Sequence, residues 1–166
     1  MLNGRQTRAS RRASGPPPAA AFSLLELVLV VAILAVVAAV AAPRYGRAAA
    51  RYRAELAAQR IAADLDLARR SARAAGVSRS VVFSVATQSY SLPGQGGMER
   101  KSATYTISLA SRPYEVRLLT ADFGGDGTVV FNGYGVADSD GTVLLQAGQE
   151  RRTVVFRAAS GKATVE

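Results

Sequence analysis

The sequence predicts an α+β fold in which a long N-terminal helix packs on a mainly antiparallel β-sheet domain. Three observations predict it: an uninterrupted apolar run over residues 22–43, an apolar stripe with helical spacing over residues 44–76, and short alternating strands separated by tight turns over residues 77–166. The chain has 166 residues, which is enough for one small domain with a tail and too few for two sizeable cores.

Residues 1–21 differ from the rest of the chain in being basic and rich in proline. They contain four arginines and no acid, and residues 16–18 are three consecutive prolines. Proline has no N–H group and clashes with the preceding turn of a helix, so this piece is predicted to be an extended basic leader.

The run from residue 22 to residue 42 reads FSLLELVLVVAILAVVAAVAA and contains one charge, Glu26. At a rise of about 1.5 Å per residue such a helix spans roughly the 30 Å hydrocarbon core of a bilayer, so residues 22–43 are predicted to cross a membrane. A cleaved secretory signal is the main alternative, because residues 39–41 satisfy the small-x-small rule. The apolar run is longer than the 7–15 residues typical of such signals, and Pro43 follows closely.

Residues 44–76 continue the helix as an amphipathic segment. The apolar stripe recurs at spacings of four and three and consists of Ala54, Ala58, Ile61, Leu65, Ala68 and Ala72. Gly76 is predicted to end this helix, because glycine readily adopts the left-handed conformation found at helix ends.

Beyond Gly76 the apolar period changes from 3.6 to 2, which predicts strands. The predicted strands are centred on residues 81–85, 105–109, 115–119, 128–131, 141–145, 153–156 and 163–165. Pairs such as Asp126-Gly127, Asn132-Gly133 and Asp140-Gly141 lie between them and are typical of hairpin turns. The apolar stripe on residues 54–72 is the available partner for the apolar face of this sheet.

The composition disfavours catalysis. The chain has no Cys and no His, which excludes thiol and imidazole nucleophiles and the usual zinc and haem ligands. We therefore expect a protein that is not an enzyme and has no cofactor. The carboxylates of Asp122, Asp126, Asp138 and Asp140 are close in sequence, but Asp-Gly pairs more often make tight turns than calcium loops, so no metal site is predicted.

The net charge of +9 raises the possibility of a nucleic-acid partner. Arg151, Arg152, Arg157 and Lys162 are the candidate contacts, because they cluster near the C-terminus. However, residues 80–166 contain eight basic and eight acidic residues, so the excess charge falls on residues 1–21 and 44–79. The only aromatic residue interleaved with the four candidates is Phe156, which the strand alternation predicts to be buried, so nucleic-acid binding is disfavoured and not excluded.

Glu26 is the unusual feature of the apolar run, since an ionised carboxylate in hydrocarbon is costly unless it is paired. The motif Phe22-Ser23-Leu24-Leu25-Glu26-Leu27, the apolar run behind it, and Pro43 and Tyr45 resemble the type IV pilin and type II secretion pseudopilin superfamily. The resemblance implies cleavage by a prepilin peptidase between Ala21 and Phe22, N-methylation of Phe22, a role for Glu26 in subunit assembly and a helix bend at Pro43. Ala21 departs from the glycine that the family usually has before the cut.

The rest of the chain is similar to the GspH/FimT branch of this superfamily, notably in residues 67–72, 130–135 and 152–165. This implies a minor pseudopilin of a type II secretion system, which assembles into or initiates or caps a periplasmic pseudopilus. Other pseudopilins or pilins, the prepilin peptidase and the inner-membrane secretion platform are its implied partners. The implied location is the bacterial inner membrane, crossed once, with the C-terminal domain in the periplasm.

A FimT-like minor type IV pilin that contributes to DNA uptake is the alternative. Charge gives no orientation, since four arginines precede the apolar run and four others follow it closely.

Overall fold

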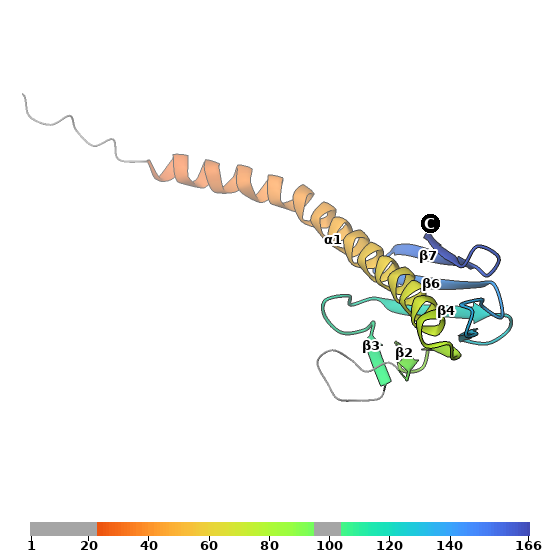
Figure 1. Ribbon diagram of the computed structural model, residues 1–166. Coiled ribbons are helices and arrows are strands. Elements are labelled where there is room, and N and C mark those ends of the chain that lie inside the picture. Colours follow the sequence, from red (N-terminus) through yellow and green to blue (C-terminus); the bar gives the residue numbers. More distant parts are fainter. Residues whose placement is uncertain (1–22, 95–103) are drawn as a thin grey trace, which may run out of the picture. The chain divides into compact units, whose positions relative to one another are not determined.

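The computed structural model of the chain describes residues 23–94 and 104–166, without the side chains of residues 42 and 43. The described part contains one helix, α1 (Leu24–Ala75), and eight strands (Figure 1). The strands are β1 (Arg79–Ser84), β2 (Ser89–Pro93), β3 (Thr104–Ser108), β4 (Arg117–Phe123), β5 (Thr128–Phe131), β6 (Gly141–Ala147), β7 (Glu150–Arg157) and β8 (Lys162–Val165). The chain divides into two compact units between Ala39 and Val40. We call residues 24–39 the apolar segment and residues 40–166 the head.

Helix α1 has 52 residues and is stopped at both ends by local sequence. At its start, the backbone N–H of Glu26 donates a 3.1 Å hydrogen bond to Oγ of Ser23, which therefore caps an otherwise unsatisfied donor. At its end, Gly76 adopts a positive φ of 63°, as predicted. The helix end also lies against the loop at Gly133, where a Cβ would come within 2.7 Å of the carbonyl oxygen of Gly76, so that the approach requires glycine.

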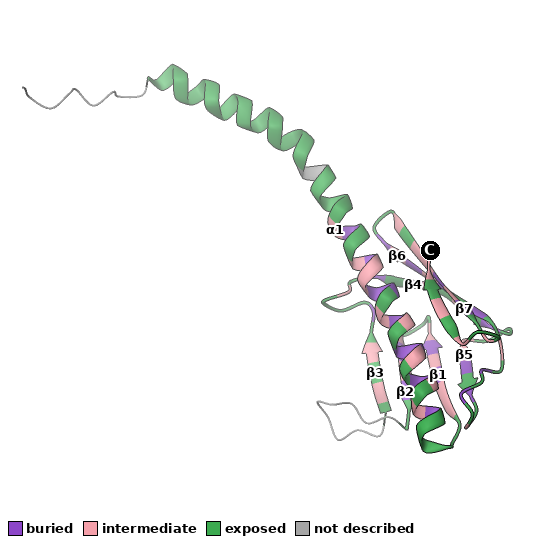
Figure 2. Ribbon diagram, turned by 45° about the horizontal axis from the view of Figure 1, so that its top comes forward, coloured by how far each residue is buried: buried purple, intermediate pink, exposed green. Residues whose placement is uncertain are grey.

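The predicted stripe of α1 forms the helical side of the head core. All six predicted residues, Ala54, Ala58, Ile61, Leu65, Ala68 and Ala72, are buried, and Ala50 and Ala57 extend the same face (Figure 2). Most of these side chains are alanines, so the helix contributes a row of mainly small side chains to the core. The prediction of an α+β fold with a long N-terminal helix on antiparallel strands is confirmed.

The strands form two four-stranded antiparallel sheets, where the sequence predicted one. One sheet has the order β3-β2-β1-β5 and the other has the order β4-β6-β7-β8. The division arises because β5 pairs with β1 while β4 pairs with β6, so that neighbouring strands in the chain join different sheets. Every strand pair in both sheets is antiparallel.

Strand β2 is absent from the predicted set. Its residues Tyr90 and Leu92 are buried and alternate with half-buried serines, so the period-2 signal is present but short. Two predicted boundaries are also wrong: Val85 lies beyond β1 and is exposed, and β4 begins at Arg117 rather than at residue 115.

Aromatic side chains join the two sheets into one core with α1. The rings of Phe83 and Phe123 stack with their centroids 5.4 Å apart, and those of Phe131 and Phe156 meet edge to face at 5.6 Å. Gln88 adds a polar link, because its side-chain amide donates to the carbonyl of Leu118 and accepts from the N–H of the same residue. Both sheets and the helix therefore share a single core.

Candidate functional site

The apolar segment is exposed along its whole length (Figure 2). Its large apolar side chains expose between 45% and 80% of their surface, which a monomer in water does not tolerate over such a length. It belongs to the one helix in the described part of the chain that is long and apolar enough to cross a membrane. By length and composition, this helix is consistent with a membrane anchor.

Glu26 is the single charged residue of the apolar segment and lies in the first turn of α1. A carboxylate there is favourable for the helix, because it faces the positive end of the helix dipole. No ion pair to Glu26 is found among residues 23–94 and 104–166. The predictions of cleavage between Ala21 and Phe22 and of methylation at Phe22 concern residues outside the described part.

Pro43, the predicted bend, lies within the helix assignment of α1. Its side chain lies outside the described residues, and the bend stays a prediction. Tyr45, which also belongs to the matching motif, is 80% exposed.

Within the described part of the head, one charged residue is buried, and the sequence analysis missed it. Asp64 is 4% exposed and accepts a 2.6 Å hydrogen bond from the hydroxyl of Tyr90 on β2. Nε of Arg60, one helical turn earlier, donates to the same carboxylate oxygen at 3.1 Å, and Arg60 also donates to the hydroxyl of Tyr105 on β3. Asp64 follows Ile61 by three residues, so its position on the buried face was the available signal.

The pKa values of this cluster are shifted in the directions that its geometry dictates. Burial raises the pKa of the Tyr90 hydroxyl, and the neighbouring Asp64 carboxylate raises it further. Burial works to lower the pKa of Arg60, but the nearby Asp64 and Tyr105 outweigh it, so that the net shift is upward. The Tyr90 phenol stays protonated and the Arg60 guanidinium stays charged, so both groups donate hydrogen bonds to Asp64. The cluster therefore links α1 to the sheet that contains β2 and β3.

Two further ion pairs attach α1 to the strands and their loops. Nε of Arg152 on β7 donates to Oε2 of Glu55 at 2.9 Å, and Arg53 pairs with Glu115, which precedes β4. The hydrogen bond from Arg152 lowers the pKa of Glu55, and a second one from Gln59 acts in the same direction. The part of α1 around Arg53 and Glu55 is therefore attached to the rest of the head by ion pairs as well as by packing.

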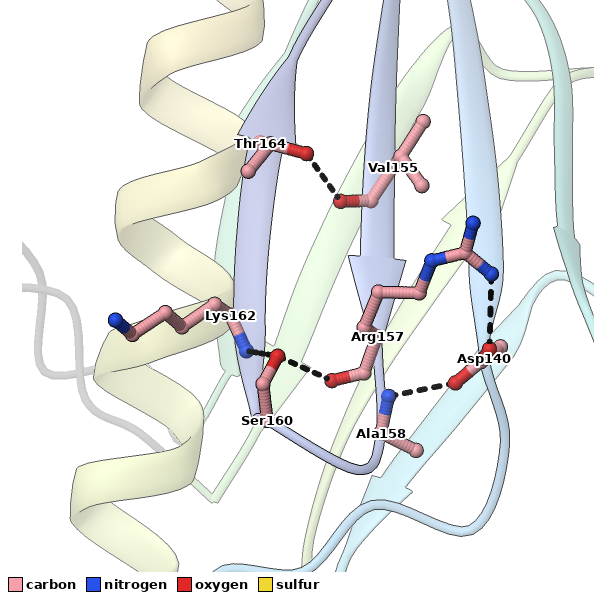
Figure 3. A network of polar contacts seen from close by, with 7 residues as sticks. All are labelled: Asp140, Val155, Arg157, Ala158, Ser160, Lys162 and Thr164. Atoms are coloured by element: carbon pink, nitrogen blue, oxygen red, sulfur yellow. Dashed lines mark hydrogen bonds and ion pairs between the residues drawn. The ribbon is translucent and has the colours of Figure 1, made fainter.

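The four candidate nucleic-acid contacts do not form one patch. Arg152 lies on the same face of β7 as the buried Val154 and is held by Glu55, whereas Arg151 lies on the opposite face. Arg157 and Lys162 are cross-strand partners, yet their side chains extend in opposite directions, and Nη1 of Arg157 pairs with Asp140 at 3.2 Å (Figure 3).

Another basic residue, Arg73, lies near the end of α1 and was not among the candidates from the sequence analysis. Gly135 packs so closely on Arg73 that a Cβ there would meet Cγ of Arg73 at 2.3 Å. The same loop presents Tyr134, which is 85% exposed and whose N–H donates to Oδ1 of Asn132 at 3.0 Å. An exposed cation and an exposed aromatic ring thus occur on neighbouring segments.

The four loop aspartates act as turn and loop acceptors. Asp122, Asp126 and Asp138 each accept a hydrogen bond from a backbone N–H, and Asp140 accepts one from Ala158 at 2.7 Å (Figure 3). This Ala158 bond and the Arg157 guanidinium lower the pKa of Asp140. The carboxylates of Asp122 and Asp126 thus act within local turns, whereas those of Asp138 and Asp140 accept hydrogen bonds from residues 8 and 18 positions away.

Comparison with known proteins adds no relative. No protein-family model matches the chain, no curated protein is significantly similar to it, and no solved structure matches its fold at a significant level.

Proposed function

We propose that this chain is a non-catalytic subunit of a membrane-anchored filament, a minor pseudopilin of a type II secretion system. The apolar segment anchors it in the bacterial inner membrane, and the head lies in the periplasm. The subunit assembles with other pseudopilins into a short pseudopilus, or initiates or caps it, and works with the inner-membrane secretion platform. The observation that carries the proposal is the lone Glu26 in the first turn of an exposed apolar helix.

The exposed apolar segment supports assembly because one surface serves two environments. In the membrane its side chains are covered by lipid, and in a filament they are covered by the same segments of neighbouring subunits. Both states remove comparable apolar area from water, so a subunit moves between them without a large hydrophobic penalty. The head does not need to unfold, since its own core is complete.

Glu26 supports the proposal because its charge needs a partner once water is removed. Cleavage between Ala21 and Phe22 by a prepilin peptidase leaves an ammonium group, free or N-methylated, at Phe22. In a bundle of such helices, the carboxylate of Glu26 neutralises this group on a neighbouring subunit. The pair then fixes the axial register of the two helices, because a slipped register leaves both charges unpaired.

The decisive experiment uses the full chain in cells that assemble the filament. Glu26→Gln keeps the size and helix preference of the side chain and removes its charge. We expect normal membrane insertion and at least about a tenfold loss of incorporation into sheared filaments, since breaking a buried pair costs several kcal/mol. Normal incorporation of the variant would contradict the proposed role. A C-terminal alkaline phosphatase fusion tests the placement of the head, and an inactive reporter would contradict it.

A minor type IV pilin that binds DNA during uptake is the second candidate. The observation that favours it is the exposed Tyr134 on the loop whose Gly135 packs against Arg73, since an aromatic ring and a guanidinium together suit stacking on single-stranded bases. The test is a salt-titrated binding assay with the full chain in detergent. Affinity that falls with salt and with Tyr134→Ala would support this function, whereas binding equal to background at low salt would remove it.

A further inference from the structure

We propose that Arg44, Arg47 and Arg51 form a binding face for the phosphate groups of anionic phospholipids. We call these three residues the arginine face. The inference rests on the membrane anchoring in the proposed function, and it adds a preference for one class of lipid where the helix leaves the bilayer.

The three arginines share one side of α1. Their spacing of three and four residues places them within about 60° around the helix axis. All three are exposed. Tyr45 and Tyr52, which are 80% and 68% exposed, lie seven residues apart on an adjoining side. Arginine and tyrosine in this combination are typical of the headgroup region of a membrane.

The arginine face lacks an acidic partner among the described residues, unlike Arg53, Arg60, Arg69 and Arg70 later in α1. Later in the helix, the acids that pair with arginine are Glu115 for Arg53, Asp64 for Arg60, and Asp66 for Arg69 and Arg70. No acid occurs in the sequence between Glu26 and Glu55. Within residues 23–94 and 104–166, no ion pair or hydrogen bond is formed by the guanidinium groups of the arginine face.

The position of the arginine face in the sequence identifies its occupant. Arg44 follows directly on the apolar run that ends at Pro43. Each headgroup layer is roughly 5–7 Å thick, which corresponds to about four residues of helix, so Arg44 and Arg47 lie within this layer and Arg51 at its outer side. A guanidinium offers a planar fork of N–H donors that matches two phosphate oxygens. Three unpaired positive charges at this depth select anionic over zwitterionic lipid.

The experiment uses the full chain in vesicles of mixed phosphatidylcholine and phosphatidylglycerol. The chain contains no Trp, so Tyr52→Trp introduces a single fluorescence donor next to the arginine face. Energy transfer is measured to a trace of dansyl-labelled phosphatidylglycerol and, separately, to dansyl-labelled phosphatidylcholine. We expect transfer to the anionic probe to be at least about twofold higher at low salt and to approach that of the neutral probe at high salt.

Two triple variants test whether the arginine face causes the preference for the anionic probe. Replacing Arg44, Arg47 and Arg51 by Gln is expected to abolish this preference. Replacing Arg70, Arg112 and Arg117 by Gln removes the same charge from exposed positions elsewhere in the head and is expected to leave it unchanged. Equal transfer to both probes in the parent, or a preference that persists without the arginine face, would overturn the inference. Failure of the parent to float with the vesicles would instead contradict the membrane anchoring itself.

Discussion

The hydroxyl of Tyr90 donates a 2.6 Å hydrogen bond to Oδ2 of Asp64, and both residues are buried. Asp64 lies on α1 and Tyr90 on β2, 26 positions later in the chain. A buried carboxylate is tolerated only when donors surround it, and Tyr90 and Arg60 are those donors. The bond therefore ties the register of the helix to the sheet that covers it.

Removing the Tyr90 hydroxyl is expected to destabilise the head. Tyr90→Phe keeps the ring in the core but leaves the Asp64 carboxylate short of a donor, so we expect a loss of about 2 kcal/mol in the free energy of unfolding. The measurement is urea denaturation of the full chain in detergent, followed by near-ultraviolet circular dichroism. Tyr134→Phe is the matched control, because Tyr134 is exposed and its hydroxyl has no partner in the described part of the chain. Equal stability of Tyr90→Phe and the parent would show that the bond contributes nothing.

The same hydroxyl predicts a dependence on alkaline pH. Burial and the nearby Asp64 raise the pKa of Tyr90 above its ordinary value of 10.0, so the folded state keeps a proton that the unfolded state loses. The resulting stabilisation is complete below pH 10 and is lost as the pH rises above it. We expect the free energy of unfolding of Tyr90→Phe to fall less steeply above pH 10, by up to about 1.4 kcal/mol per pH unit. Parallel curves for the variant and the parent would contradict this prediction.

The ion pair of Arg152 with Glu55 is expected to make a small, pH-dependent contribution. Both side chains are partly exposed, so Arg152→Gln should cost roughly 0.5–1 kcal/mol at neutral pH. Because the pKa of Glu55 is lowered in the folded state, this stabilisation is present above pH 4.5 and is lost as the pH falls through the range where Glu55 is protonated. Denaturation at several pH values measures it. Arg151→Gln, on the opposite face of β7, is the control and should change stability little at any of them.

Replacing glycine by alanine is expected to have opposite effects on stability at two positions of the chain. Gly141→Ala places a Cβ about 2.0 Å from the ring of Phe123, so we expect a loss of roughly 1–3 kcal/mol in the free energy of unfolding. Gly46→Ala meets nothing within 4 Å and lies in a helix, where it should be neutral or stabilising by up to about 1 kcal/mol. Chemical denaturation of both variants measures the difference. A stable Gly141→Ala would mean that Phe123 moves without cost.

A substitution at Ser23 distinguishes the effect of helix capping from the effect of the Glu26 charge. Ser23→Ala removes the acceptor for the N–H of Glu26 and should weaken the start of α1 by about 1 kcal/mol, seen as faster hydrogen exchange in the first turn. We expect incorporation into filaments to be retained, in contrast to Glu26→Gln. If Ser23→Ala impaired incorporation as strongly, the helix start rather than the carboxylate would be the element required.

The helix was predictable because its signals are local. The spacing from Ala54 to Ala72 identifies the buried face, and Gly76 marks the end, since both depend only on the geometry of one helix. The charge of Asp64 was not assigned to that face, because its donor Tyr90 lies on a strand that the sequence analysis missed. Strand β2 is short, contains serine at alternate positions and ends at Pro93, which weakens its β signal.

The division into two sheets could not be predicted, because strand pairing is a long-range choice. Residues 128–131 were recognised as a strand, but nothing local indicates that they pair with β1 rather than with the adjacent β4. The ion-pair partners of the basic candidates could not be predicted for a similar reason. Arg152 and Arg157 were grouped by their nearness in sequence, whereas their acidic partners, Glu55 and Asp140, lie 97 and 17 positions away.

The buried face of α1 has a mechanical consequence. Its contacts with the sheets extend from Ala50 to Ala72, about 33 Å along the helix axis, and ion pairs at Arg53 and Arg152 strengthen the end nearer the apolar segment. A load applied along the helix is therefore shared in shear by the whole row of contacts, and no single contact has to bear it alone. Within the head, this part of α1 and the sheets should therefore resist being pulled apart along the helix axis.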